Sequence, residues 1–236
     1  MAPAGSFESL AAALQGGADS VYFGVGKLNM RSRATANFSE EDLPEIVARC
    51  HEAGAKAYLT LNIIVYDEEL EAVHALCGSA RKAGVDAVIA SDLAVIAHAR
   101  SIGLEVHMSV QANVCNMASV RFYAQYADVV VLARELTLAQ IRHIIESIRK
   151  EDVRAPSGEL LRVEIFAHGA LCVAVSGKCH MSLAAYNSSA NRGACFQNCR
   201  RAYRVTDEET GNELVIDNTN PVGTGNESPQ WSTTYR

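Results

Sequence analysis

Four cysteines fall within one 28-residue stretch of this 236-residue chain, where together they could bind a metal. Cys172, Cys179, Cys195 and Cys199 follow the spacing C-x6-C-x15-C-x3-C. Four thiolates can hold an iron–sulfur cluster or a structural zinc ion. Zinc sites usually contain two closely spaced cysteine pairs, and Cys172 and Cys179 are too far apart for that pattern. The spacing favours a cluster, while zinc and four unlinked buried thiols stay open as alternatives.

The remaining cysteines predict packing rather than chemistry. The total of seven is odd, which argues against a disulfide framework and indicates a reducing compartment. Cys50 and Cys77 fall in predicted helices, where we expect small buried apolar side chains. Cys115 follows the Gln111–Asn113 turn and could face a pocket, but packing is the favoured prediction for it too. His168 and Cys172 could instead form the Cys–His pair of a hydrolase. Four clustered cysteines make that interpretation weaker, because a hydrolase needs one.

A basic segment surrounds the four cysteines in a chain that is acidic overall. The 21 basic and 27 acidic side chains give a net charge of −6. Residues 165–206 contain no Asp or Glu and five cations; because these contribute +5, the rest of the chain carries −11. Such a segment indicates an anionic partner, with a solvated surface or local ion pairs as the alternative. The five cations are Lys178, Arg192, Arg200, Arg201 and Arg204.

A repeating pattern of helix, small turn, polar residue and apolar run must position these side chains. Its intervals of about 19 to 37 residues suit one βα unit each, which predicts parallel strands joined by helices. Successive βα units without long interruptions favour an α/β fold of TIM-barrel-like (β/α) units, with a doubly wound open sheet as the alternative. No G-x-G-x-x-G follows a predicted strand, which argues against dinucleotide binding. Four residues suit helix N-caps: Ser39, Asp92, Asn116 and Thr137.

Polar residues gather where the predicted strands end, which is the working face of a (β/α) barrel. We expect them to form a polar pocket, although βα loops are generally polar and Asp92 suits a simple helix cap. The residues are Asn29, Arg31, Asn62, Ser91, Asp92, Ser109, Gln111, Asn113, Arg134, Glu135 and His168.

The βα pattern stops after residue 169. We predict a barrel-like domain over 1–169, a cysteine-rich cluster-binding segment over 170–206, a β-hairpin over 202–217 and an irregular tail over 218–236. The N-terminus lacks a targeting segment and the apolar runs are too short to span a membrane, so we expect a cytoplasmic protein.

The stretch over 164–182, EIFAHGALCVAVSGKCHMS, closely resembles the signature of the collagenase-like peptidases, peptidase family U32. The likeness extends over nearly the whole chain, including APAGS at 2–6, GADSVY at 17–22, SVQAN at 109–113, REL at 134–136 and NRGACFQNCR at 191–200. For several branches the resemblance implies oxygen-independent hydroxylation of a tRNA uridine, an rRNA cytidine or a ubiquinone precursor, with prephenate as hydroxyl source. The R-G-x-C-x3-C-R form over 192–200 is most similar to the RNA-modifying branches, in particular the tRNA branch.

The resemblance assigns expected roles to individual residues. It implies that Cys172, Cys179, Cys195 and Cys199 hold a [4Fe-4S] cluster, with zinc as the alternative. A dicarboxylate such as prephenate needs cationic and amide donors, for which we nominate Arg31, Arg134, Gln111 and Asn113. We expect RNA phosphates to bind Arg192, Arg200 and Arg201. The catalytic set that we predict is Arg134, Glu135 and His168.

Two other functions stay open. One is proteolysis by a collagenase-like peptidase, although the chain has no H-E-x-x-H or G-x-S-x-G motif. The other is a structural-zinc protein without catalysis. The first strand is nearly absent, and Ser228-Pro-Gln230 stands where the family has S-P-K-D, so we expect a truncated barrel. Missing units would come from a C-terminal region or a partner chain.

Overall fold

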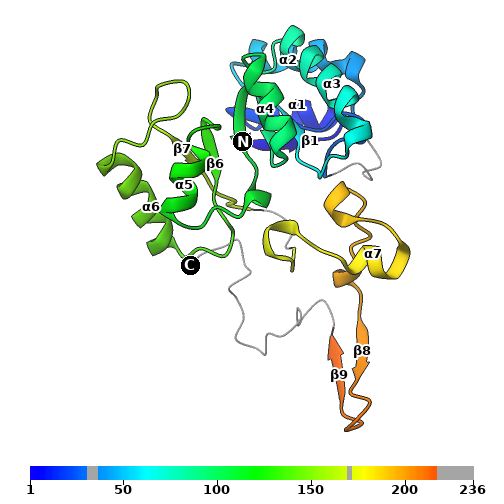
Figure 1. Cartoon of the computed structure of the whole chain (residues 1–236). Helices are drawn as coiled ribbons and strands as arrows, with labels where there is room; N and C mark the ends of the chain where they lie inside the picture. Colours follow the sequence, from blue (N-terminus) through cyan, green and yellow to red (C-terminus); the bar gives the residue numbers. More distant parts are fainter. Residues whose placement is uncertain (31–36, 169–171, 217–236) are drawn as a thin grey trace.

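Seven parallel strands form one sheet in the computed structural model, which describes residues 1–30, 37–168 and 172–216 (Figure 1). Every neighbouring pair is parallel and the spatial order equals the chain order, so the predicted (β/α) barrel-like fold is confirmed as a half-barrel. Within the described residues β1 and β7 are the sheet edges. The strands are β1 (Ala2–Ala4), β2 (Ser20–Phe23), β3 (Lys56–Leu61), β4 (Ala87–Ala90), β5 (Glu105–Met108), β6 (Val129–Val131) and β7 (Arg162–Glu164).

Helices connect successive strands and begin largely at the predicted caps. Asp92 Oδ1 accepts the Ala94 N–H at 2.9 Å, Asn116 caps α5, and Thr137 forms a capping box with Gln140. Within the described ranges no helix is long and apolar enough to cross a membrane. The helices are α1 (Phe7–Gln15), α2 (Leu43–Glu52), α3 (Leu70–Ala83), α4 (Leu93–Ser101), α5 (Met117–Tyr123), α6 (Leu138–Lys150) and α7 (Met181–Tyr186).

Alternate strand residues face the helices and form the main core. Leu59, Val88, Val106 and Val130 are fully buried there. The opposite face of the sheet has a smaller apolar cluster around Tyr58, Ala87 and Ile89. This alternation follows from the two-residue period of a strand, and it separates an apolar outer layer from an inner face that also accepts polar groups.

Charged residues occupy that inner face at β5 and β7. Glu105 Oε1 lies 3.0 Å from Nε2 of the buried His107 and also accepts a hydrogen bond from Arg162. The His107 hydrogen bond, together with Arg162, lowers the pKa of Glu105 to about 2. Burial raises the pKa of the neighbouring Glu164. Part of the half-barrel interior is therefore held by ion pairs.

The chain beyond β7 has little regular structure until the hairpin. The short 3-10 turns η4 (Val175–Gly177), η5 (Ala190–Arg192) and η6 (Asn198–Arg200) alternate with α7. The predicted hairpin is formed by β8 (Tyr203–Thr206) and β9 (Glu213–Ile216), which pair antiparallel and project away from the sheet (Figure 1). None of the seven cysteines is in a disulfide, and all seven lie in the described part of the chain.

Candidate functional site

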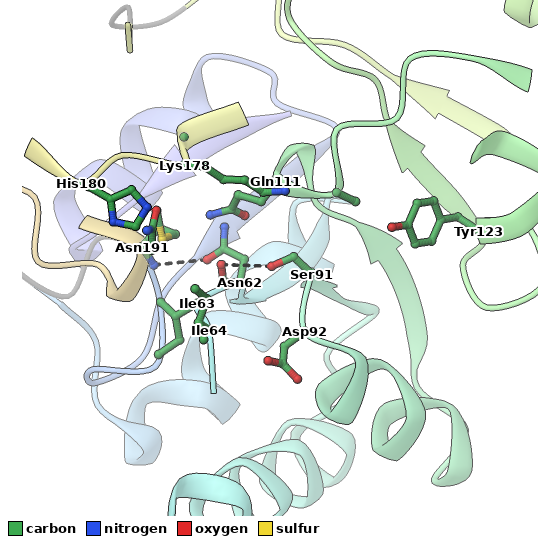
Figure 2. A pocket seen from close by; sticks show the side chains of 13 residues that line it. Asn62, Ile63, Ile64, Ser91, Asp92, Gln111, Tyr123, Lys178, His180 and Asn191 are labelled. Atoms are coloured by element: carbon green, nitrogen blue, oxygen red, sulfur yellow. Dashed lines mark hydrogen bonds between the residues drawn. The ribbon is translucent and has the colours of Figure 1, made fainter. Parts of the chain in front are cut away.

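A cavity of about 420 Å³ lies at the carboxyl ends of β3, β4 and β5, between their loops and the cysteine-rich segment. Lys178, His180 and Asn191 enter it from the cysteine-rich segment, opposite side chains from the barrel loops (Figure 2). This is the edge of the sheet at which (β/α) folds place their binding sites. The lining residues are Met30, Asn62, Ile63, Ile64, Ser91, Asp92, Gln111, Ala112, Tyr123, Gly177, Lys178, His180 and Asn191.

Hydrogen bonds between neighbouring loops shape the floor of the cavity. Asn62 Oδ1 accepts the Met30 N–H at 3.2 Å, and Ser91 Oγ donates to the Asn62 carbonyl at 3.4 Å. Asp92 caps α4 with one oxygen and accepts the Val65 N–H at 3.1 Å with the other. Both Asp92 oxygens thus have structural partners, so the carboxylate serves as a cap that holds two loops together.

The Ser109–Asn113 turn separates two residues that we expected to act together. Gln111 lines the cavity, and its side chain accepts a hydrogen bond from Ser109. Asn113 has a left-handed backbone, with φ of 54°, and its Oδ1 accepts a hydrogen bond from the buried Ser176 at 2.8 Å. Gln111 is therefore available to a ligand, whereas Asn113 joins the barrel to the cysteine-rich segment.

Lys178 and His180 are two side chains of the cavity that sequence reasoning did not place there. Neither has an ion-pair partner among the residues that the structure describes. The sequence could have indicated both residues, because each is directly adjacent to Cys179. Lys178 brings positive charge of the cysteine-rich segment to the carboxyl ends of β3, β4 and β5.

The four clustered cysteines lie close enough together to affect one another electrostatically. Burial raises the pKa of Cys199, and the nearby Cys172, Cys195 and Cys179 raise it further. Backbone N–H groups point at two of the sulfurs, from Met181 to Cys179 Sγ at 3.4 Å and from Gln197 to Cys195 Sγ at 3.3 Å. Over the described ranges no three Cys, His, Asp or Glu side chains converge closely enough for a metal site. The sulfurs are neighbours, then, without the distances of a coordination shell.

Arg192 is engaged elsewhere than at the predicted phosphate site. Its guanidinium forms a two-pronged ion pair with Glu69, donates to the Ile64 carbonyl at 2.8 Å and lies 4.1 Å from the Tyr66 ring centroid. The Arg192 hydrogen bond lowers the pKa of Glu69 to about 2. These contacts fasten the cysteine-rich segment to the loop after β3, while the phosphate-binding role expected of Arg192 stays a prediction.

Asn191 completes this attachment beside Arg192. Its Oδ1 accepts the Cys179 N–H at 3.0 Å, and its carbonyl accepts the Ile64 N–H at 3.3 Å. One residue thus links a clustered cysteine to the barrel rim and lines the cavity at the same time. This contact holds the backbone of Cys179, whose two neighbours in the sequence line the cavity.

The predicted catalytic residues do not line the cavity. Arg134 donates to the Ala174 carbonyl at 2.9 Å and so supports the start of the cysteine-rich segment. Both Glu135 oxygens are buried without a hydrogen-bond partner within the described residues, and His168 is exposed at the end of the loop after β7. Arg200 and Arg201 are exposed on and beside η6. Arg31 lies outside the described residues.

Two relatives with different names match most of this chain. A protein named collagenase from Porphyromonas gingivalis is 53% identical over 92% of this chain and 53% of its own length. The tRNA hydroxylation protein P1 of Bacillus subtilis is 33% identical over 92% of this chain and 49% of its own length. The chain spans about half the length of the curated relatives that it matches.

A solved structure and a family model agree with the fold and the sequence. The structure of the U32 peptidase Mk0906 superposes with a TM-score of 0.56 at 15% identity, covering 73% of this chain and 69% of that one. A likeness at that identity supports the fold alone. The family model for peptidase family U32 matches residues 5–232. Because this match takes in nearly the whole sequence, the chain belongs to peptidase family U32.

Proposed function

We propose that this protein takes part in oxygen-independent hydroxylation of RNA, with a tRNA uridine as the target and a small dicarboxylate such as prephenate as the hydroxyl source. The observation that carries the proposal is the position of Cys179. It belongs to the clustered cysteines, and both residues beside it line the cavity. The relative named as a tRNA hydroxylation protein supports the choice of RNA.

Four cysteine thiolates are the donor set of a [4Fe-4S] cluster, and the four sulfurs would have to draw closer together to bind one. Cys172, Cys179, Cys195 and Cys199 would hold it, and when bound it would supply single-electron transfer. The N–H groups of Met181 and Gln197 would stabilise the negative charge on two of the sulfurs. Residues 165–206 contain no Asp or Glu, so no carboxylate of this segment would oppose four thiolates.

The cavity suits a small anionic substrate. Its volume is in the range of small-molecule sites, and Ile63 and Ile64 give it an apolar side. The Lys178 ammonium and the Gln111 amide would bind carboxylate oxygens. Lys178 takes the anchoring role that we first expected of Arg134, because Arg134 is bonded to the Ala174 carbonyl and lies outside the cavity.

Proteolysis is the second candidate function, and the name of the relative at 53% identity supports it. Its residues would be His168 and Cys172. Across the described residues no hydrogen bond joins them, and the exposed His168 has no carboxylate within 4.0 Å to orient it. A hydrolase needs such a pair aligned, so the contacts of these two residues do not support proteolysis by this pair.

Metal analysis of protein purified without oxygen tests the proposal. We expect iron and sulfide at about four each per chain and broad absorption near 400 nm. Replacing each clustered cysteine by serine should remove most of the iron, whereas the exposed Cys115→Ser, the matched control, should retain it. Hydroxyuridine should then form in unmodified tRNA only when prephenate is present. A colourless protein with one zinc, or metal-free gelatin cleavage lost in Cys172→Ser, would overturn the proposal.

A further inference from the structure

Two aromatic rings and an arginine lie together on the outside of the cysteine-rich segment. The ring centroids of Tyr186, the last residue of α7, and Phe196 are 4.8 Å apart, with 36° between the ring planes. Arg201 donates to the Tyr186 hydroxyl at 2.6 Å, and its guanidinium lies 5.6 Å from the Tyr186 ring centroid. Tyr186 is 46% exposed. A partly exposed aromatic pair therefore lies beside a cation at the surface.

Three hydrogen bonds support the loops that carry this aromatic pair. The Phe196 N–H donates to Oγ of the buried Ser182 at 2.9 Å, which ties the loop to α7. Asn198 Nδ2 donates to the Met181 carbonyl at 3.4 Å, and the Tyr203 hydroxyl donates to the Asn198 carbonyl at 2.8 Å. The rings are thus supported from α7, the loop after Cys195 and the start of the hairpin, so little ordering is left for a ligand to impose.

The charge beside the rings is not neutralised locally. Arg204 pairs with Glu213 and Arg192 pairs with Glu69. Arg200 and Arg201 have no carboxylate within 4.0 Å in the described part of the chain. Unpaired guanidinium groups beside an exposed ring suit a ligand that has both phosphates and flat aromatic bases.

We propose that Tyr186 and Phe196 form a stacking platform for an unpaired base of RNA, with Arg200 and Arg201 binding the adjoining phosphates. The choice of RNA rests on the proposed function. Phe196 follows Cys195 directly, so a base stacked here lies beside the clustered cysteines. Stacking needs an exposed base face, and the platform therefore selects a single-stranded loop over a duplex.

Binding of a fluorescent single-stranded RNA loop, measured by anisotropy, tests the platform. Tyr186→Ala should weaken binding about tenfold, while Tyr186→Trp should retain it, because stacking depends on the ring. The matched control is Tyr126→Ala, an exposed tyrosine near the end of α5 that should leave affinity unchanged. Arg201→Ala should weaken binding and reduce the salt dependence by about one phosphate contact, whereas Arg149→Ala on α6 should not. Far-ultraviolet circular dichroism checks that each variant is folded.

Two outcomes would overturn the platform. One is equal RNA affinity in Tyr186→Ala and Tyr126→Ala. The other is displacement of the RNA by polyglutamate or a gelatin peptide at the same concentration as by unlabelled RNA, which would indicate a general anion or peptide surface. Hydroxylation by the unmodified chain is measured separately. If it occurs while Tyr186→Ala binds RNA normally, only the platform fails; if Tyr186 is needed for binding but no hydroxyuridine forms, only the proposed function fails.

Discussion

Arg192 is the residue whose removal should most directly release the cysteine-rich segment from the barrel. Arg192→Ala removes the two-pronged pair with Glu69, the hydrogen bond to the Ile64 carbonyl and the contact with the Tyr66 ring. About a quarter of each charged side chain is exposed, so water replaces part of the pair. We assign about 1–2 kcal/mol to the pair, about 1 kcal/mol to the carbonyl bond and about 0.5 kcal/mol to the ring contact.

These contributions amount to about 3 kcal/mol, or roughly a hundredfold increase in local opening. Hydrogen exchange with peptide resolution measures that opening. The Gly193 and Ala194 amides, which donate to the Ala190 and Ser189 carbonyls, should exchange about a hundredfold faster in Arg192→Ala. Amides of β3 and β4 should be unchanged, because their hydrogen bonds lie within the sheet.

A second ion pair supplies the control for this prediction. Arg121 and Glu151 form a two-pronged pair between α5 and the end of α6, but the Arg121 side chain is 52% exposed. Arg121→Ala should therefore change exchange anywhere in the chain by less than about fivefold. Unchanged exchange at Gly193 and Ala194 in Arg192→Ala, or equal effects of the two variants, would refute the claim that Arg192 holds the segment down.

Other predictions follow from single contacts. In acid, the Glu69–Arg192 pair should weaken as pH falls from about 4.5 to about 2, because the pKa of Glu69 is lowered to about 2 in the folded chain. The protection factor of the Gly193 amide, taken against the intrinsic exchange rate at each pH, should fall in this window, and a fall already complete at pH 5 would contradict this. The pKa of Glu105 is also about 2, so the free energy of unfolding should fall less between pH 4.5 and 2 in Glu105→Gln than in the unmodified chain. Acid titrations followed by circular dichroism measure this loss of stability, and an unchanged titration would contradict the prediction. Asp92→Ala should lower the free energy of unfolding, measured in urea, by about 1–2 kcal/mol, because α4 loses its N-cap and the Val65 N–H loses its acceptor. A loss below about 0.3 kcal/mol would show that water replaces both hydrogen bonds. Lys178→Ala should weaken prephenate binding about tenfold by calorimetry while Lys178→Arg weakens it less, and equal affinities would remove Lys178 from the binding site.

The fold was predictable because its signal is local and repeated. Each βα unit combines a small turn, a polar residue and an apolar run, and the caps at Asp92, Asn116 and Thr137 use side chains two or three residues from the amides that they bind. The hairpin over 203–216 follows from a polar turn between two short strands. Features that depend on residues a few positions apart can be read from one sequence.

The contacts of the site residues were not predictable in the same way. Arg192 meets Glu69 across 123 positions, and Asn113 meets Ser176 across 63. Nothing near Arg192 in the sequence distinguishes an arginine that binds a glutamate from one that binds a phosphate. The Tyr186–Phe196 pair was missed for a similar reason, because the two residues meet only after the intervening loop folds back on α7.

Three residues that we expected to bind substrate instead attach the cysteine-rich segment to the barrel. Asn113 binds Ser176, Arg134 binds the Ala174 carbonyl and Arg192 binds Glu69. Loss of any of these attachments should loosen the whole segment, so under the proposed function it should reduce iron retention and substrate binding together. Loss of Lys178 removes a ligand contact while the segment stays in place, so it should reduce prephenate binding at unchanged iron content. Comparing iron content with prephenate binding therefore distinguishes residues that attach the cysteine-rich segment from residues that bind the substrate. A measurement of activity alone would not distinguish them.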